Sequence, residues 1–283
     1  MKTLIVPVDF SNTSLNAAIY AGELAKHRNF DQVLLIGNFH ISVLEQVIPS
    51  PDMVPENSES ILAKRKLVEA RLSGLVEKLK YDNTGHTVVS SVIAENLLKD
   101  SIAEVIASVK PELVVIGSKA LESNEDNFVA DQLIALIEAI SIPVMVVPDR
   151  YQYVPISGAI VTGNFGAPPN AGLLVRLKII SGAHLPRLLL LHVNGDQTFE
   201  PVAGITNDCL NESLSGILPG YEYQVNSVAK HDLVHGLFDF ASRSRTELII
   251  ALPEHHSLFY ELIHTSALHK IYTFTYIPIL ILK

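Results

Sequence analysis

An internal repeat is the feature that most constrains how this chain can fold. The segment ELVVIGS at 112–118 aligns without gaps with ELIIALP at 247–253, and SIPVMVV at 141–147 aligns with YIPILIL at 276–282. Both pairs have one offset, 135 residues, from 112 to 247 and from 141 to 276. Two apolar matches in the same register, with Glu-Leu and Ile-Pro conserved between the copies, indicate an internal duplication.

Each copy has the pattern of an α/β domain, in which short apolar runs alternate with amphipathic helices. We predict strands at 3–10, 32–39, 86–96, 112–118 and 142–148, and again at 156–165, 186–193, 221–229, 247–253 and 277–283. Helices are predicted at 14–27, 54–80, 97–109, 131–140, 171–183, 205–218 and 232–242. In the first helix, the expected inward face carries Leu15, Ala18, Ile19 and Gly22.

This alternation predicts two tandem doubly wound domains, each with a five-stranded parallel sheet. The expected boundaries are 1–149 and 156–283, joined by a short linker at 150–155. Near the start of the copies the offset is 155, which indicates that the second copy lacks about twenty residues. The missing stretch corresponds most simply to the proline-containing loop at 41–60, whose role the sequence leaves open.

Composition narrows the class of protein. The 283 residues are 48% hydrophobic and 18% charged, with a net charge of −9, which argues against nucleic acid or an anionic membrane as a partner. The single cysteine, Cys209, excludes an intramolecular disulfide and a cysteine zinc cluster. The apolar run at the start is shorter than a signal peptide is expected to have, and no apolar run is long enough to span a membrane. We therefore expect a soluble, cytoplasmic protein.

Three segments make the resemblance to a known family specific: LIVPVDFS at the start, YAGELA in the first helix, and VVIGS followed by IPVMVVP. They look like the universal stress protein family, and the resemblance extends over both halves, as in a tandem universal stress protein. It implies the adenine nucleotide α-hydrolase-like fold, in which strand five lies at the sheet edge and mediates dimer pairing. Two fused copies would satisfy that pairing as an intrachain pseudo-dimer, which leaves a further homodimer open.

The nucleotide-binding branch of that family carries G-x2-G-x9-G-[ST] after strand four. In the first copy the first glycine is Gly117, but Ala120, Ala130 and Asp131 occupy the other three positions. The intervening loop adds Glu122, Glu125 and Asp126, whose charges would repel a triphosphate. In the second copy the glycines are missing and the final hydroxyl, Ser266, remains. The candidate nucleotide-binding residues, in these degenerate sites, are Pro7, Asp9, Gly117, Ser118, Lys119 and Ser266.

Several of these residues also have a simpler structural interpretation. Asp9 matches the family aspartate that faces adenine, but because the phosphate half of the site is missing we favour a strand-end residue that caps the following helix together with Ser11. In the second copy, Asn164 takes the place of Asp9, and His255, His256 and His264 lie in a loop that could assist an anion or simply face solvent.

The remaining histidines raise the question of a metal site. His231 and His235 have a zinc-compatible spacing on a helix, but the sequence places no third ligand beside them. A solvated helix face is the simpler interpretation, and we expect no metal.

The sequence also lacks the motifs of common enzyme classes, with no Walker loop and no nucleophile elbow. We therefore expect a non-enzymatic stress-response or regulatory protein without a cofactor, acting through a protein or small-molecule partner. The alternatives are a switch with one residual ATP or AMP site, and a carrier of a small molecule or lipid.

Overall fold

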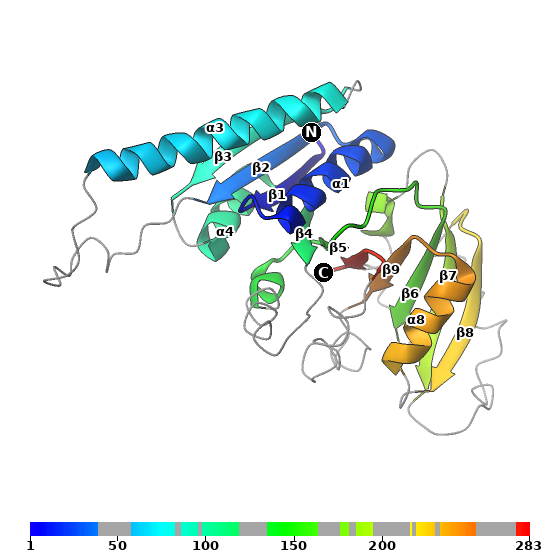
Figure 1. Ribbon diagram of the computed structural model, residues 1–283. Coiled ribbons are helices and arrows are strands. Elements are labelled where there is room, and N and C mark those ends of the chain that lie inside the picture. Colours follow the sequence, from blue (N-terminus) through cyan, green and yellow to red (C-terminus); the bar gives the residue numbers. More distant parts are fainter. Residues whose placement is uncertain are drawn as a thin grey trace, which may run out of the picture. The chain divides into compact units, whose positions relative to one another are not determined.

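The computed structural model describes eleven parts of the chain: 1–38, 58–82, 86–95, 98–118, 135–163, 176–180, 185–194, 216, 219–229, 233–252 and 276–283. The contacts divide it into two compact units, Met1–Val115 and Ile116–Lys283 (Figure 1). Each unit is an α/β layer structure, as the alternating pattern predicts.

In the first unit a parallel sheet has the strand order β3-β2-β1-β4. Its strands are β1 (Thr3–Val8), β2 (Gln32–Asn38), β3 (Val88–Ala94) and β4 (Leu113–Ser118), whose last residues pass into the second unit. All six side chains of β1 are buried, because the strand lies between two neighbours and has helices on its faces. The strand order and parallel pairing are those of half of a doubly wound fold.

Three helices cover this sheet: α1 (Asn12–Arg28), α3 (Ser58–Asp82) and α4 (Leu98–Val109). α1 and α3 share one face, since a methyl group placed on Gly22 of α1 would lie 3.6 Å from Leu79 of α3. α4 lies on the opposite face, as the right-handed connections of parallel strands require (Figure 1).

The close approach of α3 to the sheet depends on one glycine of β2. A Cβ added to Gly37 would overlap the side chain of Leu72, which is 1% exposed. Leu72 and Gly37 therefore fit together only because the strand residue has no side chain.

The second unit contains strands from both predicted copies, in the order β5-β10-β9-β6-β7-β8. The pairings are parallel except between β5 and β10, which run antiparallel with Met145 opposite Leu280. The strand bounds are β5 (Val144–Pro148), β6 (Gly158–Gly163), β7 (Arg187–Asn194), β8 (Tyr223–Ala229), β9 (Leu248–Ala251) and β10 (Ile279–Ile281). Because β5 pairs with β10, the boundary between the two compact units lies within β4 rather than at the boundary of the sequence repeat.

Helix α8 (Leu233–Ser244) packs against β8 of this unit. Lys283, next to β10, donates from Nζ to the backbone carbonyls of Ile137 and Ile140, the latter at 2.6 Å. This contact ties the end of β10 to the short helix at 135–139, in the same unit as β5.

Two helix predictions differ from the structure. At Arg176–Ile180 the chain forms a 3-10 helix, where the sequence pattern predicts an α-helix over 171–183. The predicted inward face of α1 is also partly wrong, because Ile19 is 39% exposed and the buried positions include Ala17, Ala21 and Leu24. Within the described residues, no helix is both long and apolar enough to cross a membrane.

Candidate functional site

Asp9 stands where β1 ends and the chain turns into α1. The turn passes through Phe10, whose φ of 65° lies in the left-handed region that side chains other than glycine rarely adopt. The guanidinium group of Arg71, from α3, lies 4.1 Å from the centre of the Phe10 ring. The turn is thus held by a contact from a neighbouring helix, which fixes the position of Asp9.

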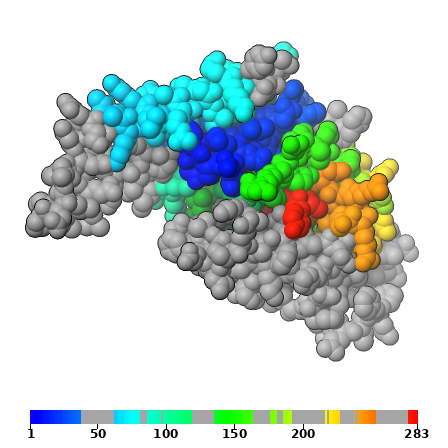
Figure 2. Space-filling model, viewed as in Figure 1, coloured from blue at the N-terminus to red at the C-terminus, as the bar shows by residue number. Residues whose placement is uncertain are grey.

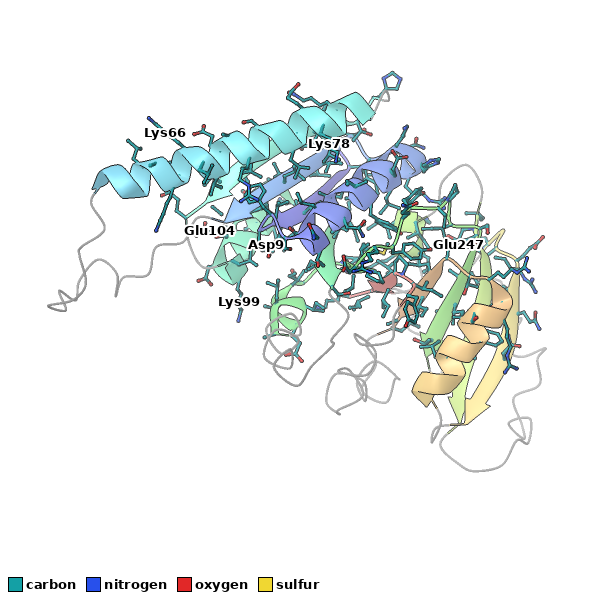
Figure 3. All side chains as sticks on the ribbon, viewed as in Figure 1. Asp9, Lys66, Lys78, Lys99, Glu104 and Glu247 are labelled. Atoms are coloured by element: carbon teal, nitrogen blue, oxygen red, sulfur yellow. The ribbon has the colours of Figure 1, made fainter. Side chains whose placement is uncertain are left out.

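The side chain of Asp9 is labelled in Figure 3. One oxygen of its carboxylate accepts three hydrogen bonds. The donors to Oδ1 are the Ser11 backbone nitrogen at 2.9 Å, the Ser11 hydroxyl at 2.6 Å and the Ser14 hydroxyl at 2.6 Å. Ser11 is the N-cap of α1, and its Oγ accepts from the Ser14 nitrogen at 3.2 Å. The predicted capping by Asp9 with Ser11 is confirmed.

The same contacts decide how readily Asp9 ionises. Partial removal of the carboxyl group from water raises its pKa, but the hydrogen bonds from Ser11 and Ser14 favour the charged form and outweigh that effect. The pKa is therefore lowered from the ordinary value of 3.8. Asp9 is an anion at neutral pH, and its charge is directed into the start of α1.

The other predicted residues of the first copy lie on β1 and β4. Pro7 is buried in β1, opposite Ile36 of β2. At the end of β4, Gly117 is half-buried and Ser118 is 3% exposed. The Ser118 carbonyl accepts a hydrogen bond from the Asp149 nitrogen at 2.8 Å, so the ends of β4 and β5 are tied together.

These residues belong to different compact units. Pro7 and Asp9 belong to Met1–Val115, whereas Gly117 and Ser118 belong to Ile116–Lys283. A joint site for one ligand therefore stays a prediction. Lys119 and Ser266 lie outside the described residues, as do the remaining motif positions Ala120, Ala130, Asp131 and Asn164.

The histidines of the second copy are largely outside the described ranges as well: His231, His255, His256 and His264. His235 lies on α8. In the part of the chain that the structure describes, no three His, Cys, Asp or Glu side chains form a group that could hold a metal ion.

Two polar clusters were not predicted. The first is completed by Ser14, whose hydroxyl donates to Asp9 beside Ser11. The i, i+3 spacing of Ser11 and Ser14 is a capping signal from which this contact could have been found. The second joins the start of β6 to the start of β9: Glu247 accepts from the Ser157 nitrogen at 3.0 Å, the Ser157 hydroxyl at 3.0 Å and the Gly158 nitrogen at 2.8 Å. No local pattern predicts this second cluster, because its members are about ninety residues apart in sequence.

A family model describing the universal stress protein family matches residues 1–148, which is more than half of the chain. The chain belongs to the universal stress protein family. A search of curated proteins finds no match to this universal stress protein.

Solved structures show the same fold over the full length. A universal stress protein from Archaeoglobus fulgidus is 13% identical, with a TM-score of 0.68, covering 99% of this chain and 96% of its own. A functionally unknown protein from Pseudomonas aeruginosa is 13% identical, with a TM-score of 0.53 and coverages of 100% and 92%. The cytoplasmic domain of a prokaryotic cation chloride cotransporter is 10% identical, with a TM-score of 0.53 and coverages of 99% and 95%. At these identities the likeness establishes the fold alone.

Proposed function

We propose that this universal stress protein is a non-enzymatic stress-response or regulatory protein that acts by binding a protein or small-molecule partner rather than by using ATP. The observation that carries the proposal is the position of Asp9. Its Oδ1 atom accepts three hydrogen bonds from Ser11 and Ser14, so the carboxylate already serves as part of the helix cap.

The sequence after β4 supports the same proposal. Ala120, Ala130 and Asp131 replace two glycines and the hydroxyl of the phosphate-binding pattern, and the loop adds three acidic side chains. At an effective dielectric constant of about 20, one like charge at about 4 Å costs roughly 4 kcal/mol, and solvent lowers that figure. Lys119 is the single basic residue between Gly117 and Asp131 and cannot offset these charges.

The proposal also covers the organisation and location of the protein. We place two tandem domains at 1–149 and 156–283 in the cytoplasm, paired within one chain and without nucleic-acid or membrane partners. Strand order supports the tandem arrangement: β3-β2-β1-β4 in the first unit corresponds to β8-β7-β6-β9 in the second. The antiparallel pairing of β5 with β10 supports the intrachain pseudo-dimer.

A second candidate is a switch with a residual ATP or AMP site. It is favoured by Gly117, which keeps the first position of the phosphate-binding pattern, and by the exposed Asp9 at the carboxyl end of β1. We consider it second because the other three motif positions depart from the pattern.

Thermal unfolding with a nucleotide panel separates the two candidates. A ligand present at about a hundred times its Kd stabilises the folded state by about 2.7 kcal/mol, which raises the Tm measurably. We expect no shift with millimolar ATP, AMP or cyclic AMP. A shift that Asp9→Ala abolishes would favour the nucleotide switch, and multiple-turnover ATP hydrolysis lost in the same variant would overturn the non-enzymatic proposal.

Native mass spectrometry of the freshly purified chain addresses the partner directly. A retained small molecule, identified by its mass, would support a ligand-binding role and distinguish a carrier from a nucleotide switch. Finding adenine nucleotide in stoichiometric amount would contradict the leading proposal.

A further inference from the structure

β3 is a free edge of the sheet in the first unit, because β2 lies on one side of it and no described strand lies on the other. All seven residues of Val88–Ala94 pair in one register with β2, without a bulge. Native proteins protect strand edges from association by a charged residue, a proline, a bulge or a very short strand. The sequence of β3, VVSSVIA, has none of these features. β3 is therefore an unprotected edge.

The backbone of β3 has alternate hydrogen-bonding groups directed out of the sheet along this edge. The Val88 nitrogen donates to the Asp31 carbonyl at 2.8 Å, so the N–H group of Val88 points toward β2. Because the peptide groups of successive residues point to opposite sides of a strand, Val89, Ser91 and Ile93 direct their N–H and C=O groups away from β2. These three residues form a row of donors and acceptors with which another extended segment can pair.

One face of β3 is also apolar and open. Val88 is 57% exposed and Val92 is 37% exposed. Their register partners on β2 are Gln32 and Ile36, so both valines point to the face away from Gly37 and α3. α4 lies on that face and packs on β1 and β2, which leaves the two valines of β3 in contact with water.

The opposite face of β3 is covered by α3, which Figure 2 shows in cyan along one side of the first unit. Val89, on this covered face, is 3% exposed. Just before the strand, Thr87 donates from its hydroxyl to the Phe30 carbonyl at 2.9 Å. β3 is thus held in its extended form by β2, α3 and Thr87. A preformed edge binds an extended segment at a lower entropic cost than a flexible strand would.

The chain that follows β3 has an excess of acidic side chains. Glu95, Asp100 and Glu104 are exposed, and the one basic residue between 95 and 104 is Lys99. Lys99 and Glu104 are labelled on α4 in Figure 3. Arg65 of α3 pairs with Glu95 at 3.1 Å, and the acidic groups remain in excess after this pair is counted. In a chain whose net charge is −9, this favours a partner with basic residues.

We propose that β3 binds an extended segment of another protein by strand addition, and that this segment has alternating apolar residues flanked by basic ones. Its backbone pairs with Val89, Ser91 and Ile93, which continues the sheet by one strand. Its apolar side chains cover Val88 and Val92 and remove them from water. Its basic residues lie beside the acidic segment that follows β3.

This role of β3 rests on the proposed partner-binding function, for which it names the surface and the chemistry of the partner. A second copy of the chain is a less suitable occupant. Its own β3 is preceded by His86 and followed by Glu95, so neither flank supplies a positive charge at neutral pH. The complementary segment therefore belongs to a different protein.

Isothermal titration of the full chain with a synthetic peptide tests the proposal. The probe alternates valine and threonine over about seven positions, the length of a common strand, with lysines at both ends so that it can pair in either direction. We expect saturable binding. The Kd should rise at least about tenfold in Ser91→Pro, which removes an outward N–H group, and in Val92→Lys, which places a charge on the open face.

The matched controls keep the edge intact. Ser91→Ala retains the backbone N–H group, and Val225→Lys makes the same change as Val92→Lys on β8, the other end of the strand order. Both should leave the Kd within about twofold. Proline is tolerated in an edge strand where its nitrogen faces solvent, so circular dichroism should show Ser91→Pro folded like the other variants.

Amide hydrogen exchange in the unsubstituted protein gives a second measurement that does not depend on any variant. The lysine peptide should protect the amides of Val89, Ser91 and Ile93 and leave exchange in β8 unchanged. The same peptide with glutamates in place of the lysines should bind at least about tenfold more weakly, and equal binding of the two would contradict a basic partner.

Three results would overturn the proposal. They are no binding of the lysine peptide, binding that leaves the outward amides of β3 unprotected, and a dimer of the chain that Ser91→Pro converts to monomer, which would assign the edge to a second copy. None of them removes the proposed partner-binding function itself. A ligand retained in native mass spectrometry would still support that function, so the two failures are distinguishable.

Discussion

At the scale of single residues, Asp9 shows how one side chain can match a family's ligand position and still have a structural task. A carboxylate directed into the first turn of a helix satisfies donors that would otherwise lack partners, and it interacts favourably with the helix dipole. Here the donors come from Ser11 and Ser14, at the beginning of α1. A ligand that required Asp9 would have to compete with these contacts.

Replacing Asp9 should therefore reduce stability whether or not a ligand binds. We expect Asp9→Ala to lower the free energy of unfolding by about 1–2 kcal/mol at neutral pH, as for loss of a helix cap. Because the pKa of Asp9 is lowered from 3.8 in the folded protein, this contribution is present above pH 3.8 and is lost as the pH falls through the lowered value. Urea unfolding at neutral and acidic pH measures both effects.

Asp9→Asn, which keeps one oxygen acceptor without the charge, should lose less stability than Asp9→Ala, and it should lack the loss of stability at acidic pH that the Asp9 carboxyl group causes in the parent protein. Glu23→Gln is a suitable control, because Glu23 forms a partly exposed ion pair with Lys26, at 3.7 Å, and such pairs contribute little to stability. An equal loss of stability in this control would contradict the assignment of Asp9 as a cap.

Gly37 permits a second test at this scale. Gly37→Ala places a methyl group inside the side chain of Leu72, and we expect a loss of about 1–3 kcal/mol from overpacking. Gly22→Ala is the matched control on α1, where the added methyl group meets Leu79 at an ordinary 3.6 Å and removes a helix-interior glycine. It should be neutral or stabilise by about 1 kcal/mol. Chemical denaturation of both variants measures the free energy of unfolding. An equal change in the two variants would contradict the close approach of Leu72 to Gly37.

At the scale of elements, strands and helices could be predicted where one periodic pattern dominated. β1, β4 and β9 are short apolar runs with every described strand residue buried or nearly so, and the repeat makes them easy to find. The face of α1 was harder, because its small residues leave little amphipathic contrast. Ile19 is exposed while Ala17 and Ala21 are buried, which reflects the close packing of α1 on the sheet.

Contacts between distant segments could not be predicted. The capping of α1 is local, and the SNTS stretch at 11–14 carries a direct signal for it. The contact between Glu247 and Ser157 joins the starts of β9 and β6, and it depends on the two strands being neighbours. Neighbouring strands follow from topology, but which side chain accepts which hydrogen bond depends on the three-dimensional arrangement.

The linker gives a prediction at the scale of elements. Tyr151 donates from its hydroxyl to the Glu247 carbonyl at 3.4 Å. Burial, with a smaller contribution from the Glu247 charge, raises the pKa of Tyr151 to about 12. Since this folded-state pKa lies above the ordinary value of 10.0, the unfolded chain loses the proton first, and stability should fall as the pH rises from about 10 to about 12.

Tyr151→Phe should reduce that alkaline loss of stability. The measurement is urea unfolding at several alkaline pH values. It is combined with a titration followed by the ultraviolet absorbance of tyrosinate, in which the variant should lack the tyrosine with a pKa of about 12. Tyr276→Phe is the control, because Tyr276 is 77% exposed. If both variants lost stability at alkaline pH as the parent does, the anchoring of the linker by Tyr151 would be contradicted.

At the scale of the whole molecule, the pairing of β5 with β10 makes the last strand of one predicted copy the neighbour of the last strand of the other. Both strands are apolar, and Met145 and Leu280 are completely buried. An unpaired edge of this composition would be a site for association with other chains. The contact also explains why the boundary between the two compact units lies within β4 rather than at the linker.

This pairing predicts that the linker is not needed to hold the two segments together. A protease site inserted after the exposed Gln152 should be cleavable in the folded protein, and the two fragments should then migrate as one species in size-exclusion chromatography. Buried apolar strands that pair along their backbones supply the attraction after the covalent connection is lost. Leu280→Asp in the cleaved chain should release the fragments, because it places an unpaired charge in the β5–β10 contact, whereas the exposed substitution Glu222→Gln should not. Separation of the fragments without any substitution would contradict the intrachain pairing.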